Sequence, residues 1–300
     1  MSTEFVTYHT NTYNNLPLLH NLVKSFEECN VRDKFEWIVT DFGSEDGTRD
    51  YLADLCKKDQ RFTAILCDEK NTFDFLDRYD LKPVNAFERK QVVFSKSRNI
   101  ARAISMGDIF VDISDDHQFF RKGDWISEFE EICNDRVKLV GKDDISVVLY
   151  RGLSHGRILK PNNRVSQELV TENGVPYFIA LEKHYDDYHF MKRDKFELIG
   201  KFKSIEDVKD ENILKGWREG NTRFNHYEEA LDFYKEAKLN KIFLKYPWTV
   251  EFPNNYQQVK TEISEKLICP IMQIENIENA FKHLQRPVSS DEIFALNLSS

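Results

Sequence analysis

The sequence is poor in cysteine, glycine and proline. Its 300 residues include 5 cysteines, 11 glycines and 8 prolines. The cysteines are scattered and never form a C-x-x-C pair, which argues against a disulfide framework and against a zinc knuckle. The low glycine and proline content, together with 41% hydrophobic and 13% aromatic residues, is typical of a folded globular chain and excludes extensive disorder.

Positive charge and long apolar runs are also lacking. The chain has 51 acidic against 42 basic residues and a formal net charge of −9. We therefore expect no stable nucleic-acid partner, because binding by counterion release needs a basic surface. No stretch approaches the roughly 18 apolar residues of a transmembrane segment, and the first residues, M-S-T-E-F, do not resemble a signal peptide. These absences predict a soluble, cytoplasmic protein. Binding at a membrane surface, without a segment that crosses the membrane, is compatible with them.

The first 150 residues alternate strand-like and helix-like segments, which predicts an α/β fold with a mainly parallel sheet flanked by helices. Strands are predicted at residues 5–10, 37–40, 62–67, 109–113, 137–140, 145–150, 176–181 and 241–245. Helices are predicted at residues 18–26, 49–56, 97–104, 125–133 and 228–237. Residues 68–92 and 151–175 show no clear period and are interpreted as long excursions. Residues 1–250 are expected to form one domain, and residues 251–300 a small, mostly helical carboxy-terminal extension.

Polar motifs stand where the first two predicted strands end. Residues 12–15 are T-Y-N-N, and residues 40–48 are T-D-F-G-S-E-D-G-T. They resemble the T-Y-N-R and D-x-G-S-x-D-G-T motifs of the large inverting GT-A family of nucleotide-sugar glycosyltransferases (family 2-like). The resemblance implies that Asp41 accepts a hydrogen bond from a base N–H and that Thr12 and Tyr13 wall the nucleotide. A polar turn with two glycines that relieve backbone strain is the alternative.

A second group of motifs lies between residues 97 and 117. S-R-N-I-A at 97–101 and G-D-I-F-V-D-I-S-D-D-H at 107–117 resemble the family's A-R-N-x-G helix start and the strand before its D-x-D metal motif. The chain has no D-x-D, because Ser114 stands at the first carboxylate position. The resemblance implies Asp116 as the direct ligand of Mn²⁺ or Mg²⁺, Asp115 on the sugar or ribose, and His117 as a further ligand or sugar donor. Diphosphate oxygens would complete the shell of such a hard cation. An acidic strand end that faces water is the alternative.

Basic residues near the start of the helix predicted at residues 97–104 are candidates for binding the negatively charged donor. Lys96 and Arg98 are expected to contact the nucleotide or the diphosphate. A helix-start arginine is just as often a salt-bridge partner on the surface.

The third group comes late in the chain. Residues 190–202, F-M-K-R-D-K-F-E-L-I-G-K-F, resemble the family's M-R-R-x-x-F-x-x-I-G-G-F segment, which lies under the acceptor site. Downstream, Glu228 and Glu229 stand where the family has an acidic pair at a helix start. One of them would take a proton from the acceptor hydroxyl, and Glu228 is the first choice. Acids in a first helical turn are also favoured by the helix dipole alone.

The motifs follow the family's order across residues 5–245, and the resemblance implies a metal-dependent glycosyltransferase. It would transfer a sugar from a nucleoside-diphosphate sugar to an acceptor hydroxyl, with inversion at the anomeric carbon. UDP is the favoured nucleotide because it is the usual one in the family. The acceptor is expected to be a glycan, a lipid-linked sugar or another hydroxyl compound. Two alternatives stay open: a sugar-nucleotide pyrophosphorylase-like nucleotidyltransferase and a non-catalytic nucleotide-sugar-binding protein.

Overall fold

The structure is a computed structural model of the whole chain. It describes residues 4–29, 33–78, 80, 93–119, 123–142, 144–149, 166–179, 189–199, 201–202, 215, 240–244 and 248–251. The helices among them are α1 (Leu16–Cys29), α2 (Thr48–Lys58), α3 (Glu69–Arg78), α5 (Phe94–Ile104), α6 (Trp125–Val140) and α7 (Arg193–Ile199). The strands are β1 (Val6–Thr12), β2 (Phe35–Asp41), β3 (Phe62–Leu66), β4 (Ile109–Asp112), β5 (His117–Phe119), β6 (Ile145–Leu149), β7 (Leu169–Val170), β8 (Pro176–Ile179), β9 (His189–Lys192), β10 (Asn240–Leu244) and β11 (Thr249–Glu251).

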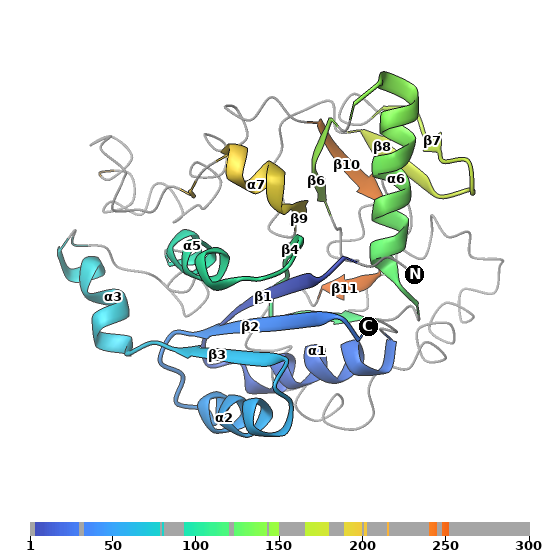
Figure 1. Cartoon of the computed structure of the whole chain (residues 1–300). Coiled ribbons are helices and arrows are strands. Elements are labelled where there is room, and N and C mark those ends of the chain that lie inside the picture. Colours follow the sequence, from blue (N-terminus) through green and yellow to red (C-terminus); the bar gives the residue numbers. More distant parts are fainter. Residues whose placement is uncertain are drawn as a thin grey trace, which may run out of the picture.

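One mixed sheet organises the described part of the chain. Its strand order is β3-β2-β1-β4-β9-β6-β10-β8-β7. Strands β1 to β4 run parallel, and so do β6 and β10, whereas β9 lies antiparallel between β4 and β6. Helices α1 and α2 lie on one face of β1–β3 and α5 on the other (Figure 1). The predicted α/β fold with a mainly parallel, helix-flanked sheet is confirmed, while the predicted extension at 251–300 lies almost wholly outside the described residues.

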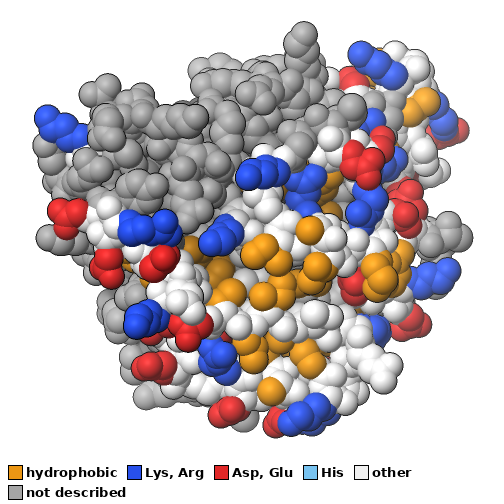
Figure 2. All heavy atoms as spheres, turned by 60° about the vertical axis from the view of Figure 1, so that its left-hand side comes forward, with side chains coloured by type: hydrophobic (Ala, Val, Ile, Leu, Met, Phe, Trp, Pro, Cys, Tyr) orange, Lys and Arg blue, Asp and Glu red, His pale blue; other side chains and the backbone are white. Residues whose placement is uncertain are grey.

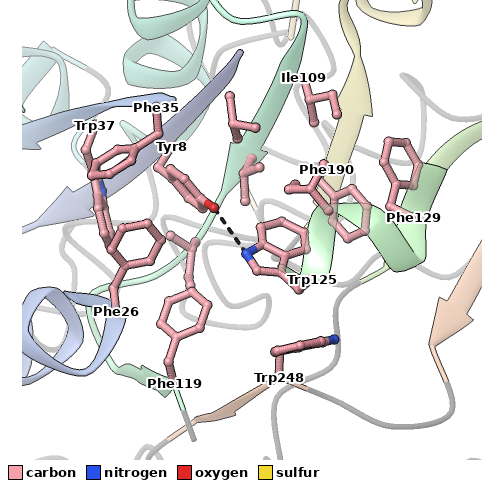
Figure 3. Packing of buried hydrophobic residues seen from close by; sticks show 14 of the residues in the cluster. Tyr8, Phe26, Phe35, Trp37, Ile109, Phe119, Trp125, Phe129, Phe190 and Trp248 are labelled. Carbon is pink, nitrogen blue, oxygen red and sulfur yellow. Dashed lines mark hydrogen bonds between the residues drawn. The ribbon is translucent and has the colours of Figure 1, made fainter. Parts of the chain in front are cut away.

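An aromatic core joins the sheet to α1 and α6 (Figure 3). Tyr8 and Trp37, on neighbouring strands, pack against Phe26 of α1 with ring centroids 4.8 Å away in each case. The indole N–H of Trp125 donates to the Tyr8 hydroxyl over 3.1 Å, which satisfies both buried polar groups. The apolar positions at helical spacing in residues 18–26 are all buried, as that spacing predicts. This core holds β1 and β2 rigidly and thereby fixes where these strands end.

Two sequence-based predictions of local structure were wrong. The predicted strand at 137–140 is the last turn of α6, which ends where Gly141, at φ 75°, donates its N–H to the Val137 carbonyl. The sequence of residues 68–92 shows no clear period and predicts a long excursion, yet α3 begins there. Asp68 caps α3 by accepting the N–H of Asn71 over 3.0 Å, and Phe73 is buried. Residues 137–140 were predicted as a strand because of their high β-propensity. Helix α3 was not predicted because its amphipathic pattern is short.

The surface of the described residues has a few large hydrophobic side chains. Figure 2 shows such side chains gathered on the face that lies to the left in Figure 1, with lysine and arginine side chains around them. The exposed large hydrophobic residues include Leu66 at the end of β3, Ile100 and Ile104 of α5, and Met106 after α5. Among the described helices, none combines the length and the apolar character that crossing a membrane requires.

Candidate active site

Five of the predicted site residues, Thr12, Asp41, Asp115, Asp116 and His117, stand at or just after the ends of parallel strands of the sheet. β1 ends at Thr12, directly paired with Asp41 at the end of β2. β4, on the other side of β1, ends at Asp112 and is followed by a turn in which the N–H of His117 donates to the Ser114 carbonyl over 3.3 Å. Because the carboxyl ends of parallel strands meet at one edge, Thr12, Asp41 and the turn at 114–117 share this edge.

The loops after β1 and β2 are fastened to each other. The Phe42 N–H donates to the Thr12 carbonyl over 3.2 Å, and the Asn14 N–H donates to Ser44 Oγ over 2.7 Å. In return, the Glu45 N–H donates to Asn14 Oδ1 over 2.7 Å. The carboxylate of Asp46 accepts the N–H of Leu16 at the start of α1 over 2.9 Å. The two motifs noticed separately in the sequence therefore form one structure, which we call the loop clasp (residues 12–16 and 42–46).

Asp41, the last residue of β2, adjoins this clasp. Its side chain is fully buried and accepts the N–H of Gly43 over 3.0 Å and that of Ser44 over 3.2 Å. Burial raises the pKa of Asp41, although the hydrogen bonds from Ser44 and Gly43 oppose the rise. Gly43 itself has φ 88°, a conformation that side-chain-bearing residues rarely adopt. Asp41 thus shapes its own loop, and its bond to a nucleotide base stays a prediction.

This role for Asp41 gives a stability prediction. Asp41→Ala should lower the free energy of unfolding by about 1–3 kcal/mol without any nucleotide present, because two buried N–H groups lose their acceptor. Urea unfolding followed by circular dichroism would measure the loss. Asp41→Asn, which keeps one acceptor oxygen, should lose less. Unchanged stability in Asp41→Ala would contradict this role.

Tyr13 is covered by α3. Its hydroxyl donates to Glu69 Oε1 over 2.7 Å, and its ring packs edge-on against Phe73 with centroids 5.7 Å apart. The start of α3 also lies so close to Gly43 that a Cβ there would come within 2.5 Å of Glu69 Cβ. Helix α3 therefore lies next to Tyr13, one of the residues predicted to line the nucleotide site. The sequence analysis did not predict this helix. The signal that could have revealed it was Asp68 as a helix cap ahead of Phe73.

Arg98 does not lie on the surface. It is 3% exposed, and its guanidinium Nε pairs with Asp112 Oδ2. The other Asp112 oxygen accepts from His9 Nδ1 over 2.7 Å, and His9 Nε2 lies 3.3 Å from Thr40 Oγ1. A buried polar network therefore links α5, β4, β1 and β2 just beneath the site edge. Lys96, by contrast, is exposed, and donor contacts of Lys96 and Arg98 stay predictions.

The residues predicted for the metal, Asp116 and His117, and for the sugar or ribose, Asp115, are buried at the same edge. Asp115 and His117 are fully buried, and Asp116 is 4% exposed. His117 Nδ1 lies 2.7 Å from Thr249 Oγ1, where β5 pairs with β11. Among the described residues, no group of three or more His, Cys, Asp or Glu side chains is arranged to hold a metal ion. A single carboxylate such as that of Asp116 is nevertheless a suitable type of ligand for Mg²⁺ or Mn²⁺, which bind phosphate oxygens alongside few protein ligands.

The third sequence motif packs against the second. The side-chain amide of Asn99 accepts the N–H of Phe202 over 2.8 Å and donates to its carbonyl over 2.7 Å. Phe190 and Met191 of β9 are fully buried beside β4. The candidate bases Glu228 and Glu229 lie outside the described residues, so their position relative to the site edge stays a prediction.

One further pattern escaped the sequence analysis. Residues 152–156, G-L-S-H-G, have the G-x-S-x-G spacing of a hydrolase nucleophile turn. That motif carries meaning only between a strand and a helix, and residues 152–156 lie outside the described part of the chain. The pattern therefore carries no functional conclusion.

Comparison with solved structures defines the fold class. S. aureus TarS is 13% identical to this chain over 94% of this chain and 43% of TarS, with a TM-score of 0.51. The mannosyltransferase PcManGT from Pyrobaculum calidifontis, solved with GDP-Man and Mn²⁺, is 14% identical over 96% of this chain and 66% of its own, with a TM-score of 0.46. S. aureus TarS 1-349 in complex with UDP is 11% identical over 98% and 76%, with a TM-score of 0.49. No protein-family model and no curated protein matches the chain.

The chain therefore has the fold of GT-A glycosyltransferases. It spans less than half the length of that TarS chain. At such low sequence identity the comparison defines the fold and leaves donor, acceptor and metal to be argued from the residues.

Proposed function

We propose that this protein is an inverting, metal-dependent glycosyltransferase that uses a nucleoside-diphosphate sugar, with UDP as the preferred nucleotide. The observation that carries the proposal is the loop clasp, which stands beside the buried carboxylates of Asp115 and Asp116 at one edge of a GT-A type sheet. Clasp and carboxylates come from three strand ends that are far apart in the sequence. Their meeting at the edge where α/β proteins bind ligands supports a nucleotide-sugar site.

The residues at this edge suit the parts of such a donor. Tyr13 and the loop after Asp41 would bind the base, and Asp115 would accept a hydrogen bond from the ribose or sugar. Asp116 would hold the Mn²⁺ or Mg²⁺, with His117 as a further ligand through Nε2. When bound, the cation neutralises the charge that develops on the departing diphosphate. Lys96 is exposed and can add positive charge there.

The reaction would be a single displacement. Glu228, or Glu229 as second choice, would remove the proton of the acceptor hydroxyl while that oxygen attacks the anomeric carbon. The bond to the diphosphate breaks on the opposite face, and the nucleoside diphosphate leaves with the electron pair. The acceptor would be a hydroxyl of a glycan, of a lipid-linked sugar or of another compound, reached from solution or at a membrane surface.

Substitution of Asp116 tests this function. Asp116→Ala should reduce sugar transfer by at least about 100-fold, because the charge of the leaving diphosphate is no longer offset. The Mn²⁺-dependent part of donor binding should disappear as well. Calorimetry with UDP-sugars, with and without Mn²⁺, and an assay of UDP release would measure both effects.

The matched control is Asp54→Ala, which removes an exposed carboxylate of α2 and should change neither quantity. Full activity of Asp116→Ala would overturn the metal assignment. Wild-type protein that binds a donor but neither transfers nor hydrolyses it would favour the non-catalytic binding protein instead.

A further inference from the structure

The edge proposed for the nucleotide carries an arginine to which the sequence analysis gave no role. Arg49 is the second residue of α2. Its Nη1 donates to the carbonyl of Cys67, just after β3, over 2.8 Å, and lies 3.6 Å from Asp41 Oδ2 at the end of β2. A cation in the first turn of a helix is disfavoured by the helix dipole, so α2 itself does not account for this residue. The guanidinium is held instead where two strands end, beside the loop clasp.

Arg49 keeps donors that a ligand can use. Its side chain is 39% exposed. Whereas Nη1 is bonded, Nε and Nη2 make no hydrogen bond to any residue that the structure describes. These two nitrogens form one side of the planar guanidinium, and their N–H groups point the same way as a fork. Because the other side is anchored, the direction of the fork is set before a ligand binds.

Asp41, the residue predicted to bind the base, is less accessible than Arg49. Its side chain is fully buried, and it already accepts the N–H groups of Gly43 and Ser44. A base N–H would have to compete with these two bonds. The group with spare hydrogen-bonding capacity at this corner is therefore the guanidinium, and Asp41 acts on it as a positioning residue through their ion pair.

A guanidinium donates hydrogen bonds and never accepts them, which limits the bases that it can recognise. Uracil and guanine have ring carbonyl oxygens that accept, and guanine adds N7 beside its carbonyl. Adenine has no carbonyl, and its amino group, itself a donor, stands next to N7. A fork with two donors therefore suits uracil or guanine and meets a second donor in adenine.

We propose that Arg49 determines the base specificity of the nucleotide site by donating from Nε and Nη2 to a carbonyl oxygen of uracil or guanine. The inference rests on the proposed function, because it takes the nucleotide of the sugar donor to bind at this edge. It narrows the donor to nucleotides whose base carries a carbonyl group and makes adenine nucleotides poor ligands.

Arg49→Met in the full chain tests this role, because methionine keeps much of the side chain's length and has no donor. Calorimetry with UDP, GDP and ADP in the presence of Mn²⁺ would measure binding without any sugar transfer. The wild-type chain should bind UDP or GDP at least about 10-fold more tightly than ADP. Arg49→Met should weaken that binding about 5- to 50-fold, the loss expected for hydrogen bonds from a charged group. Its binding of ADP should stay as in the wild type, which also shows that the site is folded.

Arg49→Lys separates the fork from its charge. Lysine keeps the positive charge but loses the two fixed N–H groups, so its preference over ADP should fall nearly as far as that of Arg49→Met. Wild-type affinity for UDP and GDP in Arg49→Lys would mean that charge alone acts. Equal losses for UDP and ADP in Arg49→Met would mean a contact to ribose or diphosphate. Either result would overturn the assignment to the base.

Arg61 supplies the matched control at the opposite end of β3. Its side chain is 40% exposed and pairs with Asp59 over 2.7 Å. Arg61→Met makes the same change of charge and should leave all three affinities unchanged, and a loss equal to that of Arg49→Met would contradict the proposal. A wild-type chain that binds no nucleotide would overturn both this inference and the proposed function. If the wild type binds UDP and Arg49→Met binds it equally well, this inference alone is wrong.

Discussion

Replacing Arg98 by alanine should lower the free energy of unfolding by about 3–5 kcal/mol, the loss expected when one partner of a buried ion pair is removed. Arg98 and Asp112 are each 4% exposed at the side chain. Without the guanidinium, the Asp112 carboxylate would stay buried beside His9 of β1. Urea unfolding of the purified chain, followed by circular dichroism, would measure the change.

The exposed pair of Arg78 and Asp74 in α3 is the control. Its side chains are 57% and 54% exposed, and Arg78→Ala should cost at most about 0.5 kcal/mol. A double-mutant cycle of Arg98→Ala with Asp112→Ala should then return a large coupling energy. A loss in Arg98→Ala as small as that of Arg78→Ala would show that the buried network does not stabilise the fold.

Glu228→Gln should reduce kcat by about 10²- to 10⁴-fold, the usual contribution of a positioned general base. Donor and metal binding should stay nearly unchanged, because the proposed base contacts the acceptor. Glu229→Gln should lose far less, since neighbouring side chains on a helix point about 100° apart. Steady-state kinetics with a UDP-sugar and calorimetry of donor binding would separate the two effects.

Other outcomes would assign the role of general base to a different residue or contradict the mechanism. The reverse result would assign the base to Glu229 with the mechanism intact. Two active variants would contradict both candidates and turn attention to Asp187 and Asp194, of which Asp194 is 64% exposed beside Lys195. A product that retains the anomeric configuration of the donor would contradict the single displacement itself.

The strand ends could be predicted from the sequence because their signals are local. An apolar run followed by a polar motif marks a buried strand that ends, and α/β alternation makes such ends meet at one edge. Thr12, Asp41 and the turn at 114–117 therefore share an edge, as the pattern predicts. The clasp itself could not be predicted, because the bonds of Asn14 with Ser44 and Glu45 depend on the distance between two loops.

The buried polar network escaped prediction for a different reason. Hydrophobic periodicity says which face of an element is buried, but it does not pair the polar residues on that face. His9 and Asp112 are separated by 103 residues and meet only because β1 pairs with β4. Arg98, placed by its motif near the donor, contacts this interior pair instead. Helix α3 was missed because its sequence is short and mostly polar, and Phe73 and Leu76 are its buried hydrophobic side chains among those that the structure describes.

The loop clasp also bears on the entropy of ligand binding. A loop that orders only when its ligand arrives loses conformational freedom at that moment, and the affinity is lower by that amount. Here the loops after β1 and β2 are already fastened by four hydrogen bonds between them, together with the bonds inside the second loop. Their freedom is lost when the chain folds. A nucleotide that binds at this edge would therefore meet a surface of fixed shape, and its affinity would depend on the fit to that shape.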